Sequence, residues 1–339
     1  MSEIKVNSIK GVGATAAAIT VNNSDGTCTA NITNNLSNRN LIINGSQIID
    51  QRNSGSAVTV SNASLTHVTD RFSLYEDTDG VISAQQSTTS PDGFTKSLKV
   101  DCTTVDTSLA SSQRLVCEHR IEGNNIAHLG FGSSAAKTIT LSFYVKSNLT
   151  GTFGGSIKNS ASNRVYIFSY SISSANTWER KTITIAGDTS GTWLTTNGTG
   201  ININWGLALG SDWVGSAGSW GTSDKHGVTG QLNLLSSTDN EWLITGVQLE
   251  VGSFSSDFEF KSFGQELALS QRYFCKMKAY AGASNGWIIQ YPVTMRAAPS
   301  ATVNSGTIGS VNQITTSTSN WNLGGGSANM AECFYSAEL

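Results

Sequence analysis

The sequence has little charge and little proline for its length. Among its 339 residues there are 21 Lys and Arg, 24 Asp and Glu and only 3 Pro, so that charged residues make up 13%. Soluble proteins contain about 25% charged residues, so the hydroxyl and amide groups of Ser, Thr and Asn must keep this chain soluble. Together with 34 Gly for turns, the composition is typical of long-lived extracellular β structure.

Several classes of function are excluded by what the sequence does not contain. The net charge is −3 without any basic block, so we predict no nucleic-acid partner. No apolar run approaches the ~20 residues of a membrane span, and the N-terminal residues lack the apolar core of a secretory signal. We therefore predict no membrane insertion. The five cysteines are odd in number and form no C-x-x-C pair, which favours free, mostly buried thiols. A pair between Cys102 and Cys117 on neighbouring strands is the alternative.

Catalytic motifs are also missing. The four histidines are scattered without metal-ligand spacing. No nucleophile elbow, zincin motif or phosphate-binding loop is present. A carboxylate pair that hydrolyses glycosides would meet only in three dimensions, and the sequence indicates no such pair. We therefore predict that the protein is not an enzyme and needs no cofactor.

Apolar and polar residues alternate in several segments, the period-2 pattern of half-buried strands. The clearest examples are residues 139–145, 183–185 and 201–209. Gly and Asn turns separate many such short segments, which predicts one antiparallel β-sandwich over residues 41–260. Residues 165–170 are apolar on both faces, so we expect that strand to be central in the sandwich or covered by another subunit.

The stretch from Trp242 to Phe274 separates this large domain from a smaller C-terminal one. Its first part predicts a strand with one buried face. The core face is expected to carry Leu243, Thr245, Val247, Leu249 and Val251, and the exposed face Gln248 and Glu250.

A short helix is predicted after this strand. Ser262 and Gln265 have the spacing of a capping box. Phe263, Leu267 and Phe274 are predicted to share one helical face. We expect a linker helix at 261–275 and a small β domain at 276–339, whose few large apolar residues call for oligomerisation to complete the core.

Tryptophan and acidic residues gather between residues 205 and 226, a segment predicted to be a long loop. The candidate sugar-binding residues are Trp213, Trp220, Asp212, Asp224 and His226. An exposed indole can cover the C–H face of a sugar while carboxylates accept hydrogen bonds from its hydroxyls. The alternative is that both tryptophans pack beneath the loop or at a subunit interface, where Trp is enriched.

The sequence resembles bacteriophage tail-fibre and virion-appendage proteins of the marine and cyanophage type, which contain a jelly-roll domain like a carbohydrate-binding module. The resemblance is carried by W-x-x-T-G-V-Q-L-E-V-G at residues 242–252 and S-F-x-x-E-L-A-L-x-Q-R-Y at 262–273. Further similar segments lie at 40–45, 51–52, 140–147 and 178–185. It implies an all-β chain made of an extended N-terminal anchor, a jelly-roll sandwich, one short helix and a small C-terminal β domain.

The resemblance also implies a position and partners. In related fibres the N-terminal segment anchors the protein to the virion, so residues 1–40 are the expected anchor, with Ile4, Val6 and Ile9 as its apolar residues. A homotrimer is implied, with Phe263, Leu267 and Phe274 as candidate contacts. The chain would lie on the virion, on the tail rather than the capsid, after assembly in the host cytoplasm.

The function implied is that of a trimeric tail fibre that attaches the phage to a host-surface polysaccharide. Its partners would be copies of itself, other virion proteins and a surface glycan. The alternative is a non-receptor structural protein such as a head fibre, decoration protein or tail adaptor.

Calcium is the metal that the resemblance suggests as a candidate. Carbohydrate-binding jelly rolls often hold structural calcium near acidic loops, and Asp77 and Asp79 lie in such a turn. Thr88 stands where an EF-hand would need Glu. The favoured interpretation is an acidic turn, with structural calcium as the alternative.

Overall fold

The computed structural model describes residues 8–9, 19–21, 24, 28–30, 38–61, 63–280, 287–305, 311–321 and 330–339. Over these residues the secondary structure is nearly all strand, which confirms the predicted all-β class. The chain divides into two units, Met1–Arg39 and Asn40–Leu339. The first unit contains an antiparallel sheet of order β1-β2-β3, with β1 (Ser8–Ile9), β2 (Ile19–Val21) and β3 (Cys28–Ala30).

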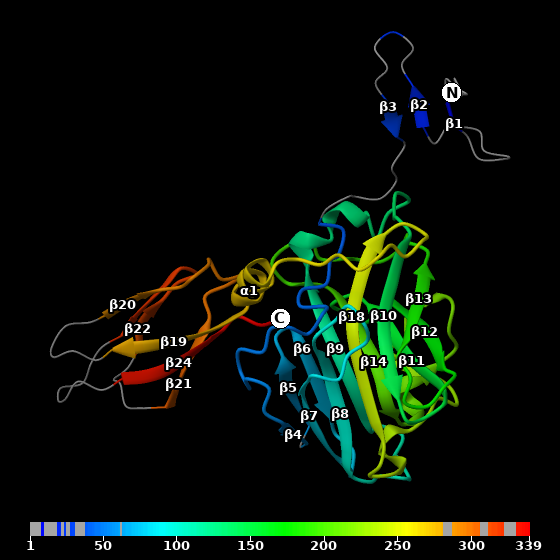
Figure 1. Ribbon diagram of the computed structural model, residues 1–339, viewed down its shortest axis with the longest axis horizontal. Helices are drawn as coiled ribbons and strands as arrows, with labels where there is room; N and C mark the ends of the chain where they lie inside the picture. The colour runs from blue at the N-terminus through cyan, green and yellow to red at the C-terminus, as the bar shows by residue number, and fades with distance from the viewer. Residues whose placement is uncertain are drawn as a thin grey trace, which may run out of the picture. The chain divides into compact units, whose positions relative to one another are not determined.

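Two antiparallel sheets of the second unit pack face to face as a jelly-roll sandwich (Figure 1). The six-stranded sheet, here the β18 sheet, has the order β13 (Glu179–Ile185), β10 (Ile139–Ser147), β18 (Glu241–Val251), β8 (Ser97–Thr104), β7 (Val81–Ser87) and β4 (Val58–Val60). The seven-stranded sheet, here the β9 sheet, has the order β16 (Trp220–Gly221), β12 (Val165–Ile172), β11 (Gly151–Lys158), β14 (Thr199–Leu209), β9 (Arg114–Glu122), β6 (Phe72–Glu76) and β5 (Ser64–Thr69).

The remaining elements are short. The connections contain η1 (Gly123–Asn125), η2 (Ala127–Leu129), η3 (Ser211–Trp213), η4 (Leu234–Ser236) and a parallel ribbon of β15 (Val214–Gly215) and β17 (Gly227–Val228). After the sandwich come the helix α1 (Phe263–Gln271) and two three-stranded sheets. Their orders are β19 (Phe274–Tyr280), β24 (Met330–Ser336), β21 (Ser300–Ser305), and β20 (Trp287–Gln290), β23 (Thr318–Trp321), β22 (Val311–Ile314). No helix in the described residues is long and apolar enough to span a membrane.

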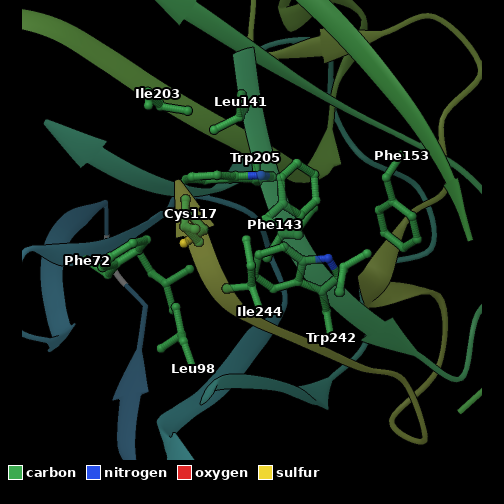
Figure 2. Packing of buried hydrophobic residues seen from close by; sticks show 14 of the residues in the cluster. Phe72, Leu98, Cys117, Leu141, Phe143, Phe153, Ile203, Trp205, Trp242 and Ile244 are labelled. Carbon is green, nitrogen blue, oxygen red and sulfur yellow. The ribbon is translucent and has the colours of Figure 1, made fainter. Parts of the chain in front are cut away.

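Aromatic and aliphatic side chains together fill the space between the two sheets (Figure 2). Trp205 of β14 is fully buried, and its ring lies 5.9 Å from that of Phe143 on β10 and 6.3 Å from that of Phe72 on β6. Trp242 of β18 donates a hydrogen bond to the hydroxyl of Tyr170 on β12 over 3.2 Å. The predicted inner face of residues 139–145 is confirmed, because its apolar side chains all belong to this core.

The predicted core face of β18 is wrong for its first half. Ser142 pairs with Gln248 but Tyr144 pairs with Thr245, so β18 contains an extra residue relative to β10. Gly246 lies in this bulge with a φ of +60°, a left-handed conformation that glycine adopts without steric cost. The bulge changes the alternation, so that Trp242 and Ile244, rather than Leu243 and Thr245, join Val247 and Leu249 in the core.

The predicted exposed face of β18 is also wrong, because the chain folds back over it. Gln248 and Glu250 are both fully buried. The Glu250 carboxylate accepts a hydrogen bond from the backbone N–H of Ser256 at 2.8 Å. The side-chain carbonyl of Gln248 accepts one from the backbone N–H of Glu259 at 2.8 Å. Neighbouring segments therefore satisfy polar groups that the alternation alone assigns to solvent.

The helix α1 begins as predicted but buries a different face. Ser262 and Gln265 form the capping box, with the Ser262 hydroxyl accepting from the Gln265 N–H. The buried residues are Glu266 and Ser270, whereas Phe263 is 61% exposed. The Glu266 carboxylate accepts from the backbone N–H of Asn44 at 2.8 Å, and burial raises its pKa. The helix ends before Phe274, so the predicted apolar face does not exist.

The strand that is apolar on both faces is covered by its own chain. Val165 and Ile167 of β12 form a small cluster with Val228 of β17. Among the cysteines with described side chains, Cys102, Cys117, Cys275 and Cys333 are free and buried, as predicted; the side chain of Cys28 lies outside the described residues.

Glu338 ties the C-terminal residues to the sandwich. Its carboxylate forms ion pairs with Arg71 and, at 3.0 Å, with Arg52. The backbone carbonyls of Ala337 and Glu338 accept from the Arg296 guanidinium at 2.8 and 2.9 Å. Although burial would raise the pKa of Glu338, the charges of Arg71, His67 and Arg52 together hold it at about 2.

Truncation of the central aromatic residues is expected to be costly. Phe143→Ala should lower the free energy of unfolding by about 3–5 kcal/mol, because it removes a fully buried ring and leaves a cavity. Val105→Ala is the control, since Val105 is 44% exposed and should change stability by no more than about 0.5 kcal/mol. Urea denaturation followed by fluorescence measures both values. Equal effects would contradict the assigned core.

The Glu338 ion pairs predict a specific acid sensitivity. The folded pKa of Glu338 is about 2 against a reference value of 4.5, so the ionised form stabilises the fold above pH 4.5. This stabilisation, roughly 3 kcal/mol, is lost as the pH falls from 4.5 to 2. Glu338→Gln should remove that part of the pH dependence of stability. Glu332→Gln on the partly exposed face of β24 is the matched control, and an unchanged slope in the Glu338 variant would contradict the prediction.

Candidate functional site

The outer face of the β9 sheet carries a hollow of about 480 Å³. On β9, the odd-numbered residues from Leu115 to Ile121 face the core, so the even-numbered ones face outward. The hollow is lined by Leu65, Tyr75, Arg114, Val116, Glu118, Arg120, Lys158, Asn159, Ser160, Ser162, Thr199, Asn202, Asn204, Asp224 and His226. Strand pairing sets Asn202 opposite Arg120 and Asn204 opposite Glu118, so polar side chains from β9 and β14 are brought side by side.

Two ion pairs organise the floor of the hollow. Arg120 contacts Glu118 at 2.7 Å, and the ammonium of Lys158 contacts Asp224 at 2.8 Å. Burial lowers the pKa of Lys158, while the Asp224 carboxylate opposes that effect. These pairs fix long side chains in place before any ligand arrives, which reduces the entropy lost on binding.

Two amide side chains in the hollow have unused hydrogen-bonding capacity. The Asn202 amide donates to Glu118 at 3.2 Å, and the Asn204 amide donates to the Ser156 hydroxyl at 3.3 Å. The side-chain carbonyl oxygens of both residues are buried without a partner among the described residues. Buried polar atoms are nearly always hydrogen-bonded, so these two oxygens are exceptions within the described residues.

Arg114 lies at the end of the hollow where aromatic side chains gather. Its guanidinium carbon lies 3.9 Å from the centre of the Trp213 ring and 4.6 Å from that of Tyr75. One of its terminal nitrogens lies 3.1 Å from Nε2 of His226. Because arginine can only donate, His226 accepts at Nε2. Burial, followed by the charges of Lys158 and Arg114, lowers the pKa of His226 well below its usual range, so its ring is neutral near pH 7.

Of the five predicted sugar-binding residues, the structure places four in or beside the hollow and one elsewhere. Asp224 and His226 line the hollow, and Trp213 lies against His226 with ring centres 5.1 Å apart. Asp212 is exposed beside it and accepts from the Ser111 hydroxyl at 2.9 Å. Trp220 does not line the hollow.

Trp220 packs at the edge of the sandwich core. Its ring lies 5.3 Å from that of Tyr166 and 5.5 Å from that of Trp193. Its indole N–H donates to the carbonyl of Ala186 at 2.8 Å. These contacts correspond to the packing alternative for this tryptophan.

Most of the hollow was not predicted. The residues missed include Tyr75, Arg114, Glu118, Arg120, Lys158 and Asn202. A signal was present on β9, where Arg114, Glu118 and Arg120 alternate with Leu115 and Cys117. That alternation identifies an outward polar face but not the strands beside it.

The other predicted sites have separate positions. Asp77 accepts from the backbone N–H of Arg114 at 2.6 Å, and the Asp79 backbone donates to Asp106 at 3.2 Å. These bonds account for an acidic turn, and within the described residues no group of three His, Cys, Asp or Glu is placed to hold a metal. Ile9 lies in β1 and is 54% exposed, whereas Ile4 and Val6 lie outside the described residues.

The candidate trimer contacts differ in exposure. Phe263 is 61% exposed and Leu267 is half-buried. Phe274 is 2% exposed, with the Arg52 guanidinium 3.6 Å from its ring centre and the Phe334 ring 5.4 Å away. Phe274 is therefore enclosed by its own chain.

No protein-family model matches this sequence, and no curated protein matches it. Among solved structures, it is similar to the enzymatically active domain of tailspike protein 4 from bacteriophage CBA120, at 14% identity and a TM-score of 0.32 over 63% of this chain and 21% of that one. It thus spans about a fifth of the tailspike chain.

Carbohydrate-binding modules are also among the similar structures. A family 61 module in complex with β-1,4-galactotriose matches at 9% identity and a TM-score of 0.31, over 63% of this chain and 99% of that one. The family 11 module of a Clostridium thermocellum cellulase matches at 12% identity and a TM-score of 0.28, over 56% and 96%. Similarity at this level assigns no role to any residue of this chain.

Proposed function

We propose that this chain binds a polysaccharide in the hollow on the outer face of the β9 sheet. The observation that carries the proposal is the set of amide, carboxylate and cationic side chains that line one hollow together with Tyr75. Sugar hydroxyls donate as well as accept hydrogen bonds, and they match a site of amides, carboxylates and cations. Tyr75 supplies a half-buried aromatic face for the C–H surface of a sugar ring.

The proposed activity is binding without catalysis. Glycoside hydrolysis requires a carboxylic acid that protonates the leaving oxygen and a second carboxylate that acts as base or nucleophile. The carboxylates that line the hollow, Glu118 and Asp224, each form an ion pair with a cation. Both carboxylates therefore hold cations of the hollow in place.

The sequence resemblance supports a biological setting for this binding. We infer that the chain is part of a phage virion and acts as a trimeric tail fibre that attaches to a host-surface polysaccharide, with residues 1–40 as the anchor. A structural virion component without receptor function is the alternative, and the packed position of Trp220 is the observation that favours it.

Substitutions in the hollow should separate sugar contact from packing. Tyr75→Ala and Asn202→Ala are each expected to weaken binding about tenfold or more, because each removes a ring face or a polar group from the lining of the hollow. Trp213→Ala should weaken it as well, since Trp213 supports Arg114 and His226. Binding is measured by calorimetry against the polysaccharide that a glycan array identifies.

The matched control is Trp220→Ala. It should lower the melting temperature, because Trp220 packs on Tyr166 and Trp193, and leave affinity unchanged. Loss of binding in this variant combined with full binding in Tyr75→Ala would place the ligand elsewhere and overturn the proposal.

An exposed aromatic patch supports the trimer. Phe254, Phe260 and Phe263 are 79%, 61% and 61% exposed. The Phe260 ring lies 5.2 Å from that of Phe94 and 4.8 Å from that of Phe258, so Phe260 belongs to an aromatic cluster with these two residues. Large exposed apolar surface marks interaction sites, and we propose that further copies of the chain cover these three exposed side chains.

The trimer proposal is tested by the mass of the protein in solution. Sedimentation equilibrium at micromolar concentration should give a trimer for the unaltered chain and smaller species for the triple change Phe254→Ser, Phe260→Ser, Phe263→Ser. Leu194→Ser, at another exposed apolar side chain, is the control and should remain trimeric. A monomeric unaltered chain would overturn the proposal.

A further inference from the structure

The side chains that line the hollow include more cations than carboxylates. Arg114, Arg120 and Lys158 supply three cations, and Glu118 and Asp224 supply two carboxylates. Arg120 pairs with Glu118 and Lys158 with Asp224. The Arg114 guanidinium contacts His226, Trp213 and Tyr75, and no carboxylate of the described residues pairs with it.

The environment of Arg114 fixes the cation without neutralising it. The rings of Trp213 and Tyr75 limit its movement, and His226 accepts one of its hydrogen bonds at Nε2. His226 is buried and neutral, so it carries no charge to offset that of the guanidinium. A fixed, partly desolvated cation that faces a hollow is most favourably paired with an anionic group of a ligand.

We propose that the polysaccharide bound in the hollow contains a sugar with a carboxylate, as in a uronic acid, and that this carboxylate pairs with Arg114. The inference rests on the proposed function and adds the chemical class of the ligand. Guanidinium presents its donors in a planar fork that matches a carboxylate through two parallel hydrogen bonds. Tyr75 and Asn202, which also line the hollow, then contact the rest of the sugar.

The experiment compares acidic polysaccharides with their own neutral forms. Polygalacturonate, alginate and hyaluronate are each tested beside the carboxyl-reduced polymer, in which the uronate is converted to the neutral sugar. Affinity electrophoresis and calorimetry with the full chain should show at least one acidic polymer bound about 10–100-fold more tightly than its reduced form. Dextran sulfate distinguishes a carboxylate from a sulfate ester as the source of the anion.

Variants of Arg114 assign the preference to this residue. Arg114→Gln should remove the difference between acidic and reduced polymers, and Arg114→Lys should keep part of it, because the charge remains but the fork is lost. Arg180→Gln is the control, since Arg180 is exposed on β13 of the opposite sheet, and should keep the full difference. Melting curves establish that each variant is folded.

Each remaining result decides against the proposal. Equal binding of acidic and reduced polymers, or a preference that survives Arg114→Gln, overturns the carboxylate site and leaves polysaccharide binding intact. Stronger binding of dextran sulfate than of every uronate overturns the carboxylate assignment. Failure to bind any neutral or acidic polysaccharide on an array overturns the proposed function together with this inference.

Discussion

Burial of the inner faces of the two large sheets is the interaction on which the rest of the structure depends. Trp205, Phe143 and Phe72 meet between the sheets and are fully enclosed. Because successive side chains of a strand point to opposite faces, each residue in the core places its neighbours on the outer surface. On β9, Cys117 lies in the core and Glu118 lies in the hollow. The packing of the core therefore also fixes which side chains of β9 face the hollow.

A second set of buried side chains is polar. Glu250, Gln248 and Glu266 are enclosed, and each is hydrogen-bonded to backbone from another segment. Removing one partner of such a bond leaves an uncompensated polar group, which costs more than the bond itself contributes. These contacts join the segment after β18, the helix α1 and the residues near Asn44, so the elements that leave the sandwich are held in defined positions.

The candidate site was only partly predictable. Asp224 and His226 were selected because they lie near tryptophans in the sequence, and both line the hollow. Trp220 met the same criterion but packs on Tyr166 and Trp193. Arg114 and Asn202 lie far apart in the chain, and only the pairing of β9 with β14 brings their strands together. Pairing between distant strands depends on tertiary packing and not on local alternation.

Spacing over a few residues was enough to predict some features of this chain. These are the all-β class, the inner face of residues 139–145 and the capping box at Ser262, since strand alternation and helix capping are local. The folded domain alone reveals the bulge at Gly246, the burial of Gln248 and Glu250, and an Arg114 guanidinium without a carboxylate partner among the described residues. Each of these depends on which distant segment lies alongside, and that contact is settled by packing of the whole domain.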